Sequence, residues 1–260
     1  SPAPRRGPVA NRAEYDAVVV GGGPNGLGAA VALAREGLTV LVLEARDEIG
    51  GGCRSGELTE PGFIHDVCAA IQPMGVLSPL VRSLPLRELG VEWAAPEIAL
   101  AHPFDDGTAA VLRRSLEDTA RGLGEDGAAY EGLVRPFVRR SDAFFDEILR
   151  PIRVPRHPLL MARFGMRGLR SAEGLLRSRF RGRDARALFA GCAAHSFVPL
   201  DRAGTASYGL ALLIAGHAVD WPCVVGGSGR LTEALGAHLV SLGGEIRTGH
   251  PVRSLSDIPP

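Results

Sequence analysis

One stretch, residues 15–44 (YDAVVVGGGPNGLGAAVALAREGLTVLVLE), constrains the fold of this 260-residue chain more than any other. The apolar run at 17–20 predicts a strand buried on both faces of a parallel sheet. Alanine and leucine recur at helical spacing over 27–35, and Gly37 ends that helix. Residues 39–43 predict a second strand. This order of strand, helix and strand predicts a βαβ unit.

A glycine loop joins the first strand to the helix. Gly21, Gly23 and Gly26 form G-x-G-x-x-G, which permits a tight turn, backbone approach to a pyrophosphate, and close packing of helix on strand. Backbone donors at these glycines and at Asn25 are expected to hold the phosphates at the helix N-terminus. Glu44 ends the second strand 23 residues after Gly21, where a carboxylate accepts hydrogen bonds from an adenosine ribose. In a chain with 34 glycines the motif alone is weak evidence for a dinucleotide site. Here a strand precedes it, a helix and a second strand follow it, and an acid ends that second strand, as the site requires.

The amino-acid composition limits the kinds of function that the chain can have. Net charge is zero, so global electrostatics predicts neither a nucleic-acid binder nor an enzyme for acidic substrates. All 29 cationic residues are arginine, which rules out lysine chemistry within this sequence. The four cysteines, Cys53, Cys68, Cys192 and Cys223, have neither C-x-x-C nor metal-ligand spacing. We therefore expect no metal site, reduced buried thiols and a cytoplasmic protein, with a flexible tail at 1–13 and no signal peptide.

A family resemblance appears beyond the ribose acid. The glycine loop is followed by Glu44-Ala45-Arg46, Ile49-Gly50-Gly51, Ser55, Pro61-Gly62-Phe63 and Asp66. This combination resembles the FAD-dependent flavoproteins grouped with amine oxidases and phytoene desaturases, especially soluble phytoene-dehydrogenase-like members. Many relatives have arginine directly after the double glycine, where this chain has Gly52; Arg54 is the alternative cation.

The resemblance implies FAD as the cofactor and a set of contact residues. By this likeness the segment from Cys68 passes close to the flavin ring, with Cys68 either a covalent attachment site or a small buried thiol. Val252 matches a strand position whose backbone touches adenine. The implied cofactor contacts are Gly21, Gly23, Pro24, Asn25, Gly26, Glu44, Ala45, Arg46, Gly51, Gly52, Arg54, Ser55, Ala69, Ala70 and Val252.

The fold class expected is α/β, a Rossmann-like FAD-binding domain with a parallel sheet plus an inserted, mainly helical α+β substrate domain. The expected boundaries are 14–75 and 222–260 for the FAD-binding domain, incomplete at its C-terminus, and 76–221 for the substrate-binding domain.

Within the substrate domain, Asp105-Asp106-Gly107 joins two predicted strands, Ser115 starts a helix, and Pro136 kinks the next helix or starts a new one. An apolar stripe at helical spacing predicts core packing and contains Tyr130, Leu133, Val134, Phe137, Phe144, Phe145 and Ile148.

The end of the substrate domain carries an uncharged stretch, 203–219, which predicts a buried helix lining a cavity rather than a membrane span. Tyr208 and His217 are its candidate substrate contacts, with core or surface roles as the alternative. A second glycine loop, at Gly226, Gly227 and Gly229, is interpreted as a structural turn, because no acid follows at the spacing of a ribose contact.

Segment 150–186 holds eleven arginines and two acids, interleaved with apolar residues. It predicts either a solvated helical face or peripheral contact with an anionic membrane. Nucleic-acid binding is not expected, since no stacking aromatics accompany the charge.

The primary functional hypothesis is an FAD-dependent oxidoreductase, of dehydrogenase, desaturase, oxidase or isomerase type, that moves a hydride from a hydrophobic or polyene-like small molecule to flavin. No catalytic acid, base or nucleophile stands out. Relatives of this kind continue well beyond the equivalent of Pro260, so a complementary C-terminal chain or segment is expected, and the chain alone is not expected to hold FAD tightly. Alternatives are an FAD-binding subunit inactive alone, an amine oxidase, a disulfide reductase using Cys53, and an NAD-dependent dehydrogenase.

Overall fold

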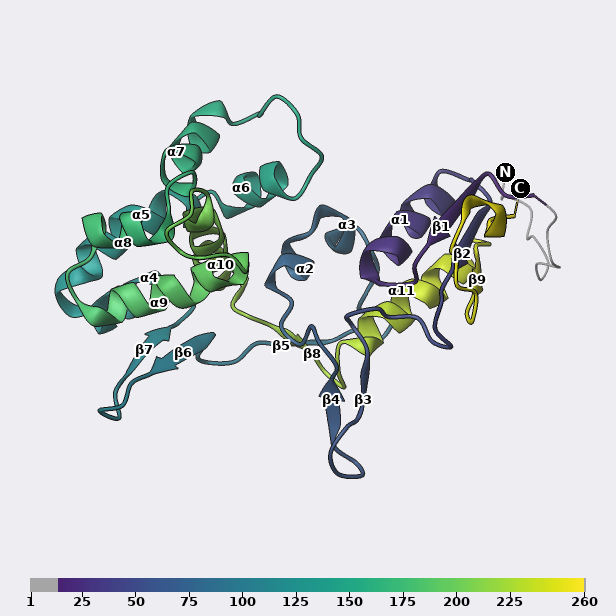
Figure 1. The fold of residues 1–260 in the computed structure, drawn as a ribbon, viewed down its shortest axis with the longest axis horizontal. Helices are drawn as coiled ribbons and strands as arrows, with labels where there is room; N and C mark the ends of the chain where they lie inside the picture. Colours follow the sequence, from purple (N-terminus) through teal and green to yellow (C-terminus); the bar gives the residue numbers. More distant parts are fainter. Residues whose placement is uncertain (1–13, 260) are drawn as a thin grey trace. The chain divides into compact units, whose positions relative to one another are not determined.

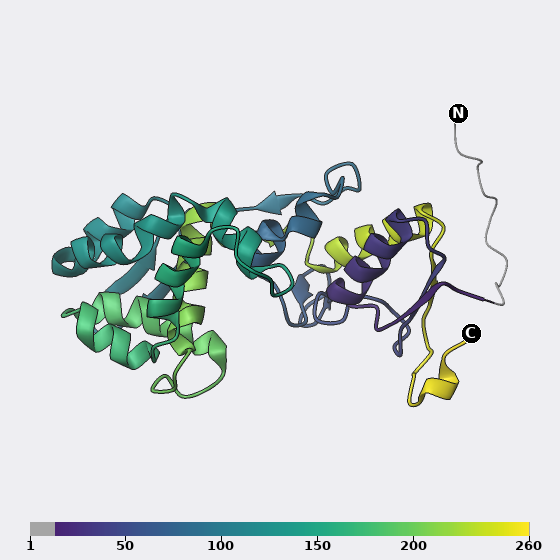
Figure 2. The same ribbon diagram turned by 90° about the horizontal axis from the view of Figure 1, so that it is seen from above.

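The computed structural model describes residues 14–259, so the tail predicted at 1–13 lies outside the described residues (Figures 1 and 2). The chain divides into two compact units. Of the described residues, the first unit contains 14–71, 83–94 and 223–259, and the second contains 72–82 and 95–222.

The first unit is built on a parallel sheet with strand order β1-β2-β9. Helices α1 and α11 lie side by side and contact the sheet (Figure 1). This arrangement confirms the predicted α/β class with a Rossmann-like parallel sheet. The elements of this unit are β1 (Ala17–Val20), α1 (Pro24–Arg35), β2 (Val40–Leu43), β3 (Ser55–Glu57), β4 (Ile64–Asp66), β5 (Trp93–Ala94), β8 (Cys223–Val224), α11 (Gly229–Ser241), β9 (Glu245–Arg247) and a 3-10 turn (Leu255–Asp257).

The prediction that residues 17–20 are buried on both faces is wrong for β1, whereas the neighbouring β2 has that burial. Strand β2 pairs on both edges and all four of its residues are buried. Strand β1 pairs with β2 alone among the described residues, and Val20 is 54% exposed. An apolar run therefore identified the strand but not its position at the edge of the described sheet.

The second unit packs its helices around α10 (Thr205–Val219), which contacts α2, α5, α7, α8 and α9. Leu210, Leu213 and Ile214 of α10 are completely buried, as predicted for the uncharged stretch. The other elements are α2 (Pro73–Leu77), α3 (Pro79–Arg82), β6 (Leu100–Pro103), β7 (Ala109–Leu112), α4 (Leu116–Gly122), a 3-10 turn (Gly124–Asp126), α5 (Gly127–Val138), α6 (Ser141–Ile148), α7 (Pro158–Gly168), α8 (Ala172–Arg179), α9 (Arg183–Ala193) and a 3-10 turn (Ala194–Ser196).

Local signals in the second unit are largely confirmed. Strands β6 and β7 form the antiparallel pair expected around Asp105-Asp106-Gly107, and the Ser115 hydroxyl accepts a hydrogen bond from the Asp118 amide at the start of α4. Pro136 lies inside α5, which continues to Val138, and α6 begins only at Ser141. The predicted stripe forms core, since Tyr130, Leu133, Val134, Phe137, Phe144 and Phe145 are all buried.

No helix in the described part of the chain is both long and apolar enough to cross a bilayer.

The buried pair Tyr130 and His217 links three segments of the second unit. The Tyr130 hydroxyl lies 2.7 Å from His217 Nε2, and His217 Nδ1 lies 3.0 Å from the Arg114 carbonyl oxygen. Burial lowers the pKa of His217 from 6.5, against the opposing effect of the hydrogen bonds to backbone carbonyls. His217 is therefore a hydrogen-bonded core residue, which agrees with the core role given as the alternative to a substrate contact.

This burial predicts a pH-dependent stability. Because the folded-state pKa of His217 is depressed, the unfolded chain binds more protons as the pH falls, so the free energy of unfolding should fall between about pH 7.5 and 5.5. Urea denaturation across that range should show a weaker pH dependence in His217→Gln. The dependence should not vanish, since burial also lowers the pKa of His102. The exposed His250→Gln is the matched control, and an equal change there would contradict the assignment to His217.

Candidate dinucleotide-binding site

The glycine loop between β1 and α1 has the geometry of a phosphate loop. Gly21 has φ of +104°, a region that favours glycine. A Cβ on Gly26 would lie 2.0 Å from the Gly21 carbonyl oxygen, so only glycine lets the helix approach the loop this closely. Helix α1 begins with Pro24, and no side chain caps it at Gly23. Its first-turn amides are thus left to a ligand or to solvent, as a pyrophosphate site requires.

The double glycine beyond Glu44 packs against the first loop, backbone to backbone. The Gly50 amide donates to the Gly22 carbonyl oxygen at 2.8 Å. Gly51 has φ of +54°, and a Cβ on it would lie 3.0 Å from the Cα of Gly23. A side chain at Gly23 or Gly51 would push the two loops apart. The close packing of the loops therefore explains why both contain glycine.

Glu44 is fixed at the end of β2 by the same loops. Its side chain is nearly buried, with the residue 8% exposed. One carboxylate oxygen accepts from the Gly22 amide at 2.6 Å and the other from the Arg46 amide at 2.9 Å. A carboxylate has about four acceptor sites, so two remain for ribose hydroxyls. The Gly22 and Arg46 amides therefore fix the orientation of the Glu44 carboxylate beside the phosphate loop.

Ser55 and Asp66 have a structural role that the motif match did not predict. Asp66 Oδ1 accepts from the Ser55 hydroxyl at 2.6 Å and from the Ser228 amide at 2.6 Å, and Ser55 Oγ accepts from the Gly229 amide at 2.8 Å. Burial acts to raise the pKa of Asp66, but these hydrogen bonds outweigh it and hold the pKa below 3.8. The β3–β4 hairpin thereby caps the N-terminus of α11, in agreement with a structural turn there.

Other implied contacts are distributed around these loops. The Ala69 amide donates to the Gly52 carbonyl oxygen at 2.9 Å, so the segment carrying Ala69 and Ala70 runs beside the second glycine loop. Arg54 donates to the Gly51 carbonyl oxygen at 2.9 Å and to the Glu48 carboxylate at 3.0 Å.

The placement expected of Val252 is wrong. The return strand β9 ends at Arg247, and Val252 lies in irregular chain beyond it. The strand position was implied by the family resemblance and not by a local pattern, and the contact of Val252 with adenine stays a prediction.

The thiols differ from the prediction that all are buried. Cys53 and Cys192 are buried, Cys223 is half-buried, and Cys68 is exposed beside Gly52. Exposure of Cys68 removes its interpretation as a core thiol. Tyr208, the other candidate substrate contact, is half exposed on α10.

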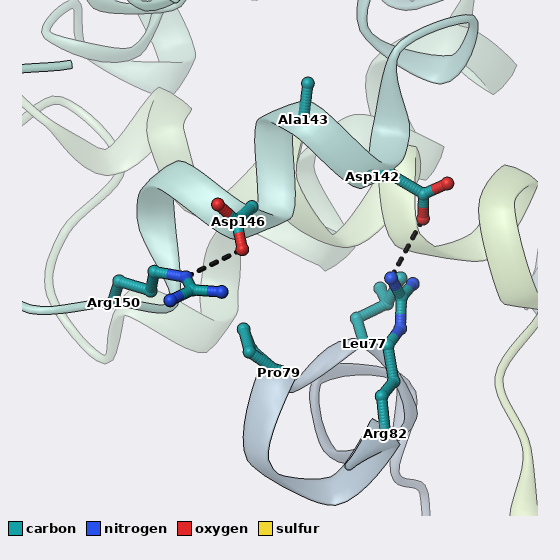
Figure 3. Close-up of a pocket in the computed structure, with 7 residues that line it drawn as sticks. All are labelled: Leu77, Pro79, Arg82, Asp142, Ala143, Asp146 and Arg150. Carbon is teal, nitrogen blue, oxygen red and sulfur yellow. Dashed lines mark hydrogen bonds and ion pairs between the residues drawn. The ribbon is translucent and has the colours of Figure 1, made fainter. Parts of the chain in front are cut away.

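A pocket of about 410 Å³ in the second unit is a weaker candidate site (Figure 3). Its charged groups neutralise one another, because Arg82 pairs with Asp142 at 2.9 Å and Arg150 with Asp146 at 2.7 Å. The hydrogen bond from Arg150 lowers the pKa of Asp146, which keeps that carboxylate ionised and paired. With cations and acids matched, this pocket offers no net charge to a ligand.

The glycine loops, the parallel sheet and the acid at the end of β2 have the arrangement of a Rossmann-like domain. Residues 19–83 match the family model described as NAD(P)-binding Rossmann-like domain. The resemblance indicated by the sequence motifs is therefore confirmed at the level of this domain and, from the solved structures below, of the fold.

Particular relatives extend the comparison. One of the subunits of limonene dehydrogenase from Castellaniella defragrans is 35% identical over 135 residues, which cover 50% of this chain and 24% of that protein. Pyridine nucleotide-disulfide oxidoreductase domain-containing protein 2 of Mus musculus is 34% identical over 154 residues, covering 57% and 25%. The matched region thus spans about a quarter of these curated relatives.

Solved structures share the fold over almost the whole chain. Putrescine oxidase bound to putrescine superposes with a TM-score of 0.56 at 20% identity, covering 92% of this chain and 51% of that one. An oxidoreductase from Methanosarcina mazei gives a TM-score of 0.58 at 19% identity, covering 90% and 51%.

Proposed function

We propose that this chain provides the dinucleotide-binding part of an FAD-dependent oxidoreductase that acts on a hydrophobic or polyene-like small molecule. The observation that carries the proposal is the packing of the two glycine loops, Gly21 to Gly23 and Gly50 to Gly51, around the Glu44 carboxylate. This arrangement offers backbone donors to a pyrophosphate and acceptors to a ribose in one place.

The residues fit the adenosine diphosphate part of FAD. Amides at the start of α1, including those of Asn25 and Gly26, would hold the pyrophosphate, and Glu44 would accept from the ribose hydroxyls. The absence of Cβ atoms at Gly23 and Gly51 leaves the backbone accessible to the phosphates. When bound, the flavin would supply the hydride acceptor, while this chain contributes binding and orientation.

Flavin rather than nicotinamide is favoured by the second glycine loop. The bond from the Gly50 amide to the Gly22 carbonyl oxygen makes that loop part of the site. In the resembling flavoproteins this double glycine accompanies FAD. The match of the family model across 19–83 includes both loops, but its description also admits NAD(P), so an NAD-dependent dehydrogenase is the alternative to be tested.

The substrate class rests on the relatives. Limonene, named in one curated relative, is an apolar hydrocarbon, which supports a hydrophobic substrate. Putrescine, named in a solved structure of the same fold, supports an amine as the second choice. The limonene dehydrogenase relative is one chain of a multi-chain enzyme by its name, which also supports a complementary chain or segment. Without that segment, this chain would bind FAD but be inactive.

Titration of the 260-residue chain with FAD, FMN and NADH tests the cofactor. Flavin fluorescence should show weak binding of FAD and a much weaker response to FMN, because FMN lacks the adenosine that Glu44 would bind. NADH should bind no better than FMN if the second loop selects flavin dinucleotide. Tight binding of NADH with no FAD binding would contradict the flavin proposal.

The need for a complementary segment is tested in the same way. Purification of the chain alone should give colourless protein, and co-expression with the proposed complementary C-terminal segment should give stoichiometric flavin. Stoichiometric flavin in the chain alone would contradict the complementary segment while supporting the cofactor.

A further inference from the structure

The solvent face of α7 is apolar where a polar face is expected. Leu159, Met166 and Leu169 lie at spacings of seven and three residues, which places them on one side of α7 and its C-terminal extension. These side chains are between 70% and 85% exposed. Leu160 and Gly168 are buried and α7 contacts α10, so the helix is already packed on its unit through another face.

The loop leading into α7 continues this feature. Ile152 and Val154 are almost fully exposed in the segment between α6 and α7, which forms a long loop in Figure 1. Scattered exposed apolar residues are ordinary, but five of them within 18 residues of one segment indicate a surface that interacts.

Arginines accompany the apolar side chains on this face. Arg163 and Arg170 occur at helical spacing with Leu159 and Met166, and both are exposed. Across residues 14–259, no acidic side chain forms an ion pair with Arg163, Arg167, Arg170 or Arg179. In the pocket of Figure 3, by contrast, arginines are matched by aspartates.

Three of these arginines form a cluster. Arg163 and Arg167 lie one turn apart on α7, where Arg167 Nη1 donates to the Arg163 carbonyl oxygen at 2.9 Å. Burial lowers the pKa of the Arg167 guanidinium, and the positive charges of Arg163 and Arg179 lower it further. Arg167 is half-buried, and its Nε has no hydrogen-bond partner in the described structure. A guanidinium with an unused donor, beside two further cations and with no ion-paired acid among residues 14–259, favours an anion.

We propose that this surface, Ile152, Val154, Leu159, Met166 and Leu169 with Arg163, Arg167, Arg170 and Arg179, docks on an anionic lipid membrane. The apolar side chains would enter the boundary between headgroups and acyl chains, and the arginine cluster would bind lipid phosphate. The combination favours a membrane over a soluble anion, because free phosphate would not cover the apolar side chains.

Vesicle flotation of the intact chain tests the proposal. It should float with mixed phosphatidylcholine–phosphatidylglycerol vesicles and not with phosphatidylcholine alone, and about 1 M salt should weaken binding, because the Debye length is then about 3 Å. Replacing Leu159, Met166 and Leu169 together by serine should lower the partition coefficient about tenfold or more, and so should Arg163→Gln with Arg170→Gln and Arg179→Gln.

Matched variants outside the surface are Val240→Ser with Arg121→Gln, which are also exposed. These should float like the unmodified chain, and circular dichroism should show that every variant is folded. Equal binding to neutral vesicles, equal loss in the matched variants, or binding of inorganic phosphate without flotation would overturn the proposal. Capture of a protein partner without flotation would also overturn it.

Discussion

Replacing Gly26 with alanine is expected to lower the free energy of unfolding by about 3 kcal/mol and to abolish dinucleotide binding. The added Cβ would lie 2.0 Å from the Gly21 carbonyl oxygen, which is backbone and cannot move aside as a flexible side chain can. Either α1 or the loop must shift, and both carry the proposed phosphate contacts. Urea denaturation measures the first effect and a fluorescence titration with FAD the second.

Gly132 of α5 provides the matched control. It is also a helical glycine, but a Cβ there meets nothing within 4 Å. Gly132→Ala should therefore leave FAD binding unchanged and raise stability by up to about 1 kcal/mol through helix propensity. If Gly26→Ala behaved in the same way, the close approach of α1 to the loop would not be needed for the site.

Replacing Glu44 with glutamine is the second large effect expected. The carboxylate accepts from the Gly22 and Arg46 amides, and an amide group would place its own donor against one of them. We expect a loss of about 1.5–3 kcal/mol in stability, because a buried backbone donor loses a charged acceptor. FAD affinity should fall by about 10- to 100-fold, the equivalent of losing one charged hydrogen bond to the ribose.

Two outcomes separate the roles of Glu44. Reduced stability with unchanged FAD affinity would show that the carboxylate only supports the loop. Glu233→Gln removes an exposed carboxylate on α11 and should change neither quantity. An equal loss of affinity in that control would indicate a general charge effect instead of a ribose contact.

The sequence predicted the βαβ unit and the turn of its glycine loop because their signals are local. A tight turn needs glycine at Gly21 whatever the rest of the chain does, and the strand, loop and helix follow one another without interruption. The same holds for the start of α4, where Ser115 caps a helix within its own segment. Such features depend on neighbours along the chain.

The missed features depend on neighbours in space. Ser55 resembled a cofactor contact, yet its hydroxyl serves the N-terminus of α11, 174 residues away in sequence. The hydrogen bond between His217 and Tyr130, 87 positions earlier, could not be predicted from any spacing in the sequence. The exposure of Val20 likewise depends on which strands flank β1. Spacing carries no information on these pairings.

The central place of α10 has a consequence for folding during synthesis. This helix is the last element of the second unit to leave the ribosome, yet α2, α5, α7, α8 and α9 all pack on it. Until residue 219 has emerged, those earlier helices lack their common partner and keep their apolar faces in water. The nascent second unit is therefore expected to expose the apolar surface that chaperones bind over most of its translation, and α11 and β9 of the first unit are synthesised later still.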